Sequence, residues 1–241
     1  MAIPSAALAY KRSALMTATK VTTKPPSEEV LRARDDFKDF CVFMGKAPAK
    51  HMLEWHAELC TGEDSECLMG IGGPNTSILA PRGSAKSTVL GLFAAWMIGR
   101  HAAAKRMLRI LYIAYMVDIS RAKSATIKGI LTSNKYREVF PMVRLSKIKR
   151  SDEYWSIDYD FAGIDTAGEE AFTIACGGLK GAITSKRSQL VLIDDPIKSA
   201  ASINNPDIRR EMEQTWSNVI APTMFQGARA ICLGTRFHFD D

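Results

Sequence analysis

The sequence lacks several features that would define its class at once. No apolar run approaches the about 20 residues of a membrane-spanning helix, and the first residues show no apolar segment of a secretory signal. The five cysteines are odd in number, and no two of them form a Cys-x-x-Cys pair. These absences argue against a membrane protein, a disulfide-stapled secreted protein and a zinc ribbon. We therefore expect an intracellular protein with reduced thiols.

Acidic residues are missing from residues 1–27, which are rich in Ala, Ser and Thr and contain four basic side chains. This composition predicts a flexible basic tail, although a transit peptide is similar. The 241-residue chain is 46% hydrophobic, which suffices for one large folded domain over residues 28–241. Its formal net charge of +6 favours a partner rich in phosphate.

Residues 77–98, SILAPRGSAKSTVLGLFAAWMI, join a short apolar run, a loop of small residues and a long apolar segment. We predict a strand over residues 77–79, a loop over 80–85 and a buried helix over 86–98. Backbone N–H groups of such a loop, together with the helix N-terminus, bind phosphate. The pattern therefore predicts an ATP site. Its predicted nucleotide contacts are Ala80, Pro81, Gly83, Ser84, Ala85, Lys86, Ser87 and Thr88.

Within this loop, Lys86 is predicted to reach the β- and γ-phosphates, and the Ser87 hydroxyl to ligate Mg²⁺. Ala85 stands where glycine is expected, and we expect its methyl group to crowd the approach of phosphate. The alternative is a purely structural loop between a strand and a buried helix.

Residues 190–195, LVLIDD, form an apolar run that ends in two carboxylates. Open α/β sheets place ligand chemistry at the carboxyl ends of such strands. Asp194 is predicted to hold Mg²⁺, and Asp195 to orient or deprotonate the attacking water. A solvated Asp-Asp-Pro turn is the alternative.

Other segments extend the alternation of strand and helix. Residues 109–115 read as a buried strand, after which Asp118 is predicted to cap a helix. Ser27 is predicted to cap a helix that ends at Gly45. A second helix over residues 51–59 contains Trp55 and His56, which are candidates for adenine contact or for plain packing. We predict an α/β fold of the P-loop NTPase (ASCE) type, with a mainly parallel central sheet flanked by helices.

A basic cluster, RLSKIKR, occupies residues 144–150 and is followed by Tyr154 and Trp155. Contacts with a nucleic-acid backbone need only positioned positive charge, so this cluster is a candidate DNA-binding surface. The alternative is an exposed loop that is basic for solubility. Residues 155–157 and 172–175 are predicted to be strands of a hairpin-like segment.

The segments APRGSAKST, GGLKGAITSKRSQLVLIDDP and LGTRFHFDD resemble, in this order, the Walker A, Walker B and coupling segments of the large terminase subunit of tailed bacteriophages. The resemblance covers roughly residues 50–241. It implies a molecular motor that hydrolyses ATP with Mg²⁺ and translocates double-stranded viral DNA into a procapsid. It also implies a homo-oligomeric ring that works with the portal protein and the small terminase subunit, at the portal vertex in the host cytoplasm. The family's nuclease domain follows the coupling segment, so we expect no nuclease activity from this chain.

The resemblance also implies roles for single residues. Arg82 matches an arginine that senses the γ-phosphate, and Gly234 with Thr235 matches the coupling motif. Thr235 is also a predicted nucleotide contact, because its hydroxyl could hydrogen-bond to the γ-phosphate or to the attacking water. Ring motors complete the site with an arginine from the neighbouring subunit, for which Arg187 is a candidate here. The alternatives for this role are Lys180, Arg121 and Arg236.

Two other functions remain open from the sequence. One is a helicase-like, nucleic-acid-dependent P-loop ATPase, which strand separation would reveal. The other is a nucleotide-binding assembly module with little turnover, because Ala85 and Asp195 both weaken the site. ATP binding without hydrolysis would be its mark.

Overall fold

The computed structural model describes residues 25–60, 73–179, 186–197 and 204–235. The strands in these ranges are β1 (Thr76–Leu79), β2 (Ile110–Ala114), β3 (Leu145–Arg150), β4 (Tyr154–Ile157), β5 (Ile174–Gly178), β6 (Ser188–Asp194) and β7 (Met224–Gly234). The α-helices are α2 (Glu28–Asp35), α3 (Phe37–Phe43), α4 (Leu53–Cys60), α5 (Lys86–Ala103), α6 (Val117–Thr132), α7 (Asn134–Val139), α8 (Tyr159–Ala162) and α10 (Pro206–Thr215). The 3₁₀-helices are η1 (Lys50–Met52) and η3 (Ala221–Thr223), and η2 (Trp216–Ile220) is a π-helix.

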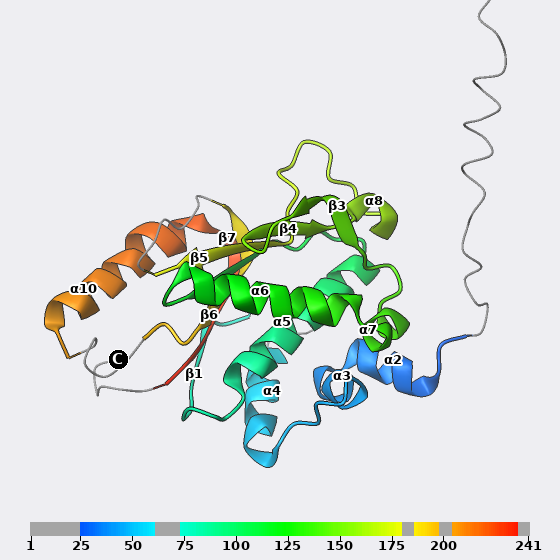
Figure 1. Cartoon of the computed structure of the whole chain (residues 1–241), viewed down its shortest axis with the longest axis horizontal. Coiled ribbons are helices and arrows are strands. Elements are labelled where there is room, and N and C mark those ends of the chain that lie inside the picture. The colour runs from blue at the N-terminus through cyan, green and yellow to red at the C-terminus, as the bar shows by residue number, and fades with distance from the viewer. Residues whose placement is uncertain (1–24, 61–72, 180–185, 198–203, 236–241) are drawn as a thin grey trace, which may run out of the picture.

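The strands form one sheet in the order β1-β7-β6-β2-β5-β4-β3 (Figure 1). The first five strands in this order are parallel, whereas β4 and β3 are added antiparallel at one edge. Helices cover both faces of the sheet. The predicted mixed α/β fold with a mainly parallel central sheet flanked by helices is confirmed.

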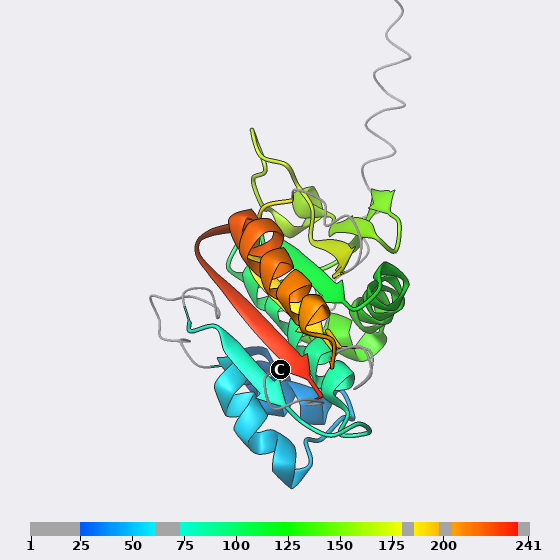
Figure 2. The same cartoon turned by 90° about the vertical axis from the view of Figure 1, so that its left-hand side faces the viewer.

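Successive side chains of the central strands point to opposite faces of the sheet, and both sets are buried. Ile110 and Tyr112 of β2 face the larger core, which α5, α6 and the N-terminal helices complete. Leu111 and Ile113 face a smaller core, to which η2 contributes Ile220. Figures 1 and 2 show α10 beside the β7 end of the sheet, away from α6. Continuous apolar strands are expected here because both faces are covered.

Two predictions about helix boundaries need correction, a break at Asp36 and the cap of α6. The Ser27 cap is confirmed, because its hydroxyl accepts a hydrogen bond from the Val30 N–H at 3.3 Å. The predicted single helix to Gly45 is nevertheless two helices, since Asp36 is extended and its carboxylate caps α3 by accepting from the Asp39 N–H at 2.8 Å. The N-cap of α6 is Met116, and Asp118 lies inside the first turn, where its charge favours the helix dipole.

The sequence predicted no strand for the basic cluster at residues 144–150 and offered an exposed loop only as the alternative to a DNA-binding surface. Most of the cluster forms β3, the edge strand of the sheet. The predicted hairpin-like pairing is confirmed next to it, where Trp155 of β4 pairs antiparallel with Ile174 of β5. Lysine is common on edge strands because it discourages pairing with another chain.

The start of α6 lies very close to the end of β5. A Cβ atom at Gly178 would come within 2.6 Å of the Val117 backbone nitrogen, so only glycine fits there. From this point α6 runs along the sheet to Thr132. None of the helices in the described ranges is both long and apolar enough to cross a membrane.

Candidate functional site

The carboxyl ends of β1, β7 and β6 meet at one edge of the sheet. The loop of residues 80–85 follows β1, Thr235 follows β7, and β6 ends at Asp194. Because β7 lies between β1 and β6, Thr235 stands between the loop and the two carboxylates. Parallel strands therefore bring together three segments that are far apart in the sequence.

The loop is held in an unusual backbone conformation. Gly83 has φ 81°, and Ala85 has φ 62° and ψ 22°, both in the left-handed region. The Ser84 hydroxyl donates to the Pro81 carbonyl at 2.7 Å, which tightens the turn. Ala85 is exposed and immediately precedes α5. Its conformation costs an L-residue about 1–2 kcal/mol, so its methyl group strains the loop.

Lys86 is the centre of the site, and its side chain is only 4% exposed. Its ammonium donates to the carbonyls of Ala80 at 3.0 Å and Pro81 at 3.1 Å, and to the Thr235 hydroxyl at 2.9 Å. The same nitrogen lies 3.7 Å from a carboxylate oxygen of Asp195. All three N–H donors are therefore engaged by the protein, and a bound phosphate would have to replace some of these partners.

Ser87 and Asp194 form the second part of the site. The Ser87 hydroxyl donates to one carboxylate oxygen of Asp194 at 2.9 Å, and the Tyr112 hydroxyl donates to the other at 3.0 Å. Asp194 is 2% exposed, and this burial raises its pKa, although both hydrogen bonds oppose the shift. The pKa of Tyr112 is also raised, first by burial and then by the charge of Asp194.

This oxygen pair fits Mg²⁺. Among the described residues, no group of three or more His, Cys, Asp and Glu side chains is arranged to hold a metal ion alone. Mg²⁺ does not need such a group, because it usually keeps several waters and binds one or two carboxylates together with substrate phosphates. Ser87 and Asp194 supply a hydroxyl and a carboxylate at the edge of the phosphate loop.

Asp195 directs its carboxylate toward solvent, in contrast to Asp194. It has φ 44°, a left-handed conformation that aspartate tolerates better than most residues, and its side chain is 45% exposed. The Thr235 hydroxyl donates to its Oδ1 at 3.1 Å. Thr235 therefore links Lys86 to Asp195 through two successive hydrogen bonds.

These groups surround a cavity of about 430 Å³. Its lining residues are Arg82, Gly83, Ser84, Ala85, Lys86, Ser87, Thr88, Tyr115, Ile119, Asp195, Ile197 and Thr235. Most of the predicted site residues thus lie around one space, with Ala80 and Pro81 contributing carbonyls to Lys86 and Asp194 lying behind Ser87.

Arg187 lies elsewhere. It directly precedes β6, whose opposite end carries Asp194, and a seven-residue strand is about 23 Å long. Its guanidinium lies 5.8 Å from the ring centroid of Phe225. Arg187 therefore does not reach the cavity of its own chain, and its role in a neighbouring subunit stays a prediction. Of the alternatives, Arg121 binds Asp118 and Glu153, and Lys180 and Arg236 fall outside the described ranges.

Sequence reasoning did not identify Tyr115, Ile119 or Ile197 as lining residues. Tyr115 had a signal, because it ends the apolar run 109–115 at the carboxyl edge of the sheet. The adenine candidates Trp55 and His56 do not line the cavity. His56 is 6% exposed and stacks on Phe37 with ring centroids 4.5 Å apart, and burial lowers its pKa.

No protein-family model matches the chain, and no curated protein matches it. One similar solved structure is the large terminase ATPase domain of Thermus phage P74-26, which is 16% identical in sequence. The match covers 82% of this chain and 68% of that chain, with a TM-score of 0.46.

Proposed function

We propose that the chain is a Mg²⁺-dependent P-loop ATPase, and that it is the motor domain of a viral large terminase that moves double-stranded DNA into a procapsid. The observation that carries the ATPase proposal is the convergence of Lys86, Thr235 and Asp195 beside the Ser87–Asp194 pair. A purely structural loop would not need a buried lysine and a partly exposed carboxylate on one cavity, with a second, buried carboxylate bonded to a serine that lines the same cavity.

Lys86 and the loop would bind the phosphates of ATP. The ammonium already lies against loop carbonyls and Thr235, so it needs little movement to meet an incoming phosphate. Arg82 lines the same cavity from the loop, and in this proposal it contacts the terminal phosphate. The loop N–H groups and the first turn of α5 add partial positive charge.

Ser87 and Asp194 would hold Mg²⁺ with the phosphates. Bound there, the ion would neutralise charge on the phosphate oxygens. Tyr112 keeps the Asp194 carboxylate oriented by donating to the oxygen that Ser87 does not contact. Tyr112 touches Asp194 and not the cavity, so it is a positioning residue.

Asp195 would accept the proton of the attacking water. Its carboxylate lines the cavity and is partly exposed, which suits a group that must meet water. Thr235 donates to the same carboxylate and accepts from Lys86, so a phosphate that draws Lys86 away also changes the environment of Asp195. This link supports the coupling role that the resemblance assigns to Thr235.

DNA translocation rests on the resemblance of three sequence segments and on the net charge of +6. In this proposal the chain acts as a homo-oligomeric ring at the portal vertex in the host cytoplasm, with the portal protein and the small terminase subunit as partners. A neighbouring subunit would supply an arginine, for which Arg187 remains the candidate. Arg187 lies far from the cavity of its own chain, and this position is compatible with contact to the cavity of a neighbouring subunit.

ATP hydrolysis measured against protein concentration, with and without Mg²⁺, tests the ATPase proposal. We expect a specific rate that rises with concentration and is lost in Asp195→Asn, while Asp207→Asn, on exposed α10, keeps the wild-type rate. Equal activity in both variants would refute the role of Asp195.

A second candidate, a nucleotide-binding assembly module with little turnover, is favoured by two observations. Ala85 strains the loop, and the three donors of Lys86 are already satisfied by the protein. ATP binding at every concentration without any Mg²⁺-dependent hydrolysis would select this function.

A further inference from the structure

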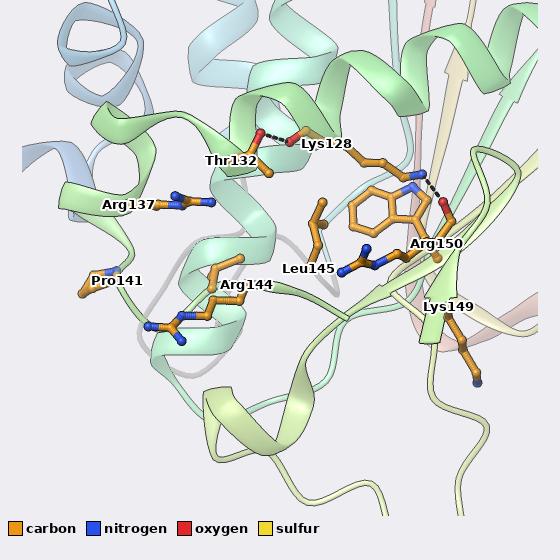
Figure 3. Close-up of a pocket in the computed structure, with 10 residues that line it drawn as sticks. Lys128, Thr132, Arg137, Pro141, Arg144, Leu145, Lys149 and Arg150 are labelled. Carbon is orange, nitrogen blue, oxygen red and sulfur yellow. Dashed lines mark hydrogen bonds between the residues drawn. The ribbon is translucent and has the colours of Figure 1, made fainter. Parts of the chain in front are cut away.

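A second and larger cavity, of about 740 Å³, lies on the same side of the molecule as α6, between α6, α7 and the edge strand β3 (Figure 3). It is lined by Lys128, Thr132, Arg137, Pro141, Val143, Arg144, Leu145, Lys149, Arg150 and Trp155. Half of these side chains are cationic, and no carboxylate is among them. The cavity therefore suits an anionic ligand.

Three of the cations are available to such a ligand. Figure 3 shows Arg137 of α7 and Arg150 of β3 pointing toward the same space from opposite walls. Arg144 lies at the rim, with its guanidinium 3.6 Å from the ring centroid of Phe161. All three arginines are exposed, and none makes a salt bridge within the described residues.

The two lysines of the cavity wall, in contrast, donate hydrogen bonds to other groups of the protein. Lys128 donates to Asp152 at 2.8 Å and to the carbonyls of Arg150 and Ser151, so it ties α6 to the β3–β4 turn. Lys149 donates to the Ala171 carbonyl at 2.7 Å, and Figure 3 shows it pointing away from the cavity. Arg150 donates its Nε to the Ser146 carbonyl at 2.8 Å, so its two terminal nitrogens, together with Arg137 and Arg144, are the donors that this surface offers to a ligand.

The arrangement of the arginines indicates the kind of anion. Arg144 and Arg150 lie on or beside β3, whose pairing with β4 shifts in register between Leu145 and Arg150, and Arg137 lies on the facing α7. A nucleic-acid strand places a phosphate about every 3.4 Å along the duplex axis, so cations on separate elements can each meet a different phosphate of one backbone. Edge-strand protection alone would explain basic residues on β3 but not the arginine that α7 contributes.

We propose that this cavity is the site where the chain holds the phosphodiester backbone of double-stranded DNA. The proposal rests on the proposed function for the class of nucleic acid, but it assigns that function to Arg137, Arg144 and Arg150. Guanidinium groups bind phosphate oxygens in pairs of parallel hydrogen bonds and read no base. Binding at this site is therefore independent of sequence.

The test measures binding of a short fluorescent duplex by anisotropy over a range of salt concentrations. The variant combines Arg137→Gln, Arg144→Gln and Arg150→Gln. Its matched control, with the same change in charge, combines Lys50→Gln, Arg209→Gln and Arg210→Gln on η1 and α10. Each lost phosphate contact reduces the steepness of log K plotted against log salt concentration by about 0.9. This slope should therefore become shallower by about 3 in the cavity variant and stay unchanged in the control.

A charge-preserving variant, with Arg→Lys at the same three cavity positions, should recover most of the slope. Far-UV circular dichroism and the unfolding midpoint check that all variants are folded. An equal loss of slope in the control, a wild-type slope in the cavity variant, or no duplex binding by the wild type would overturn the proposal. The proposal would also be overturned if the triple Gln variant lost binding of inorganic triphosphate but kept binding of the duplex.

ATP hydrolysis without DNA separates this proposal from the ATPase proposal. The cavity arginines do not line the nucleotide cavity, so the triple Gln variant should hydrolyse ATP at the wild-type rate. Arginine-dependent duplex binding by a chain that hydrolyses no ATP would support the DNA site and overturn the motor.

Discussion

Replacing Ala85 with glycine should stabilise the protein, although alanine-to-glycine substitutions usually do the opposite. Ala85 has φ 62° and is exposed, so the substitution removes no buried contact. The left-handed conformation costs an L-residue about 1–2 kcal/mol. Glycine removes this strain but adds about 0.5–1 kcal/mol of unfolded-state freedom. The expected net gain is about 0.5–1 kcal/mol, or about 1–4 °C in Tm for a domain of this size.

Urea unfolding measures this difference as a shift in midpoint at constant slope. The control is Ala125→Gly, at an exposed position inside α6, where glycine should cost about 0.8–1 kcal/mol. The two substitutions are chemically identical and should have opposite signs. If Ala85→Gly destabilises the protein as much as Ala125→Gly does, the loop does not hold Ala85 in the left-handed region. Relief of the strain should also lower the ATP concentration needed for half-saturation.

Three further predictions concern the site and its surroundings. Burial raises the pKa of Asp194, so wild-type stability should fall as pH rises from about 4 through this raised pKa, because the unfolded chain ionises first. Asp194→Asn should abolish that fall in pH-dependent unfolding experiments and also abolish Mg²⁺-dependent hydrolysis; a wild-type pH profile would contradict the assignment. Ser87→Ala should raise the Mg²⁺ concentration for half-maximal hydrolysis by about tenfold or more, while Ser217→Ala, at an exposed position of η2, should leave it unchanged. Gly178→Ala should cost about 1–3 kcal/mol in urea unfolding because its Cβ would meet the Val117 nitrogen, whereas Gly129→Ala, with no atom within 4 Å, should gain up to about 1 kcal/mol.

Local patterns predicted the elements that carry the nucleotide site. Neighbouring residues alone determine the apolar strands β1, β2 and β6 and the small-residue loop after β1. The structure has these elements where the sequence predicted them. Cap positions were less predictable, because Asp36 competes with continuation of a helix through its own side chain. The strand β3 was missed because its charges resemble those of a loop, although only three residues separate it from its partner β4.

Side-chain positions that depend on strand order and direction also could not be predicted from the sequence. Tyr112 lies in the middle of an apolar run, and only the order of β2 beside β6 brings its hydroxyl to Asp194. Arg187 is close to Asp194 in sequence, but the intervening strand extends in one direction and separates the two. Proximity in sequence is a poor guide wherever an extended strand lies between two residues.

The helix α6 contributes to both cavities. Ile119, near its start, lines the nucleotide cavity, and Lys128 and Thr132, near its end, line the basic cavity. These positions are about 14–20 Å apart along one continuous helix. A ligand that shifted this helix at one end would alter the wall of the other cavity. If nucleotide and DNA bind at the two proposed sites, thermodynamic linkage requires that each change the affinity for the other by the same factor.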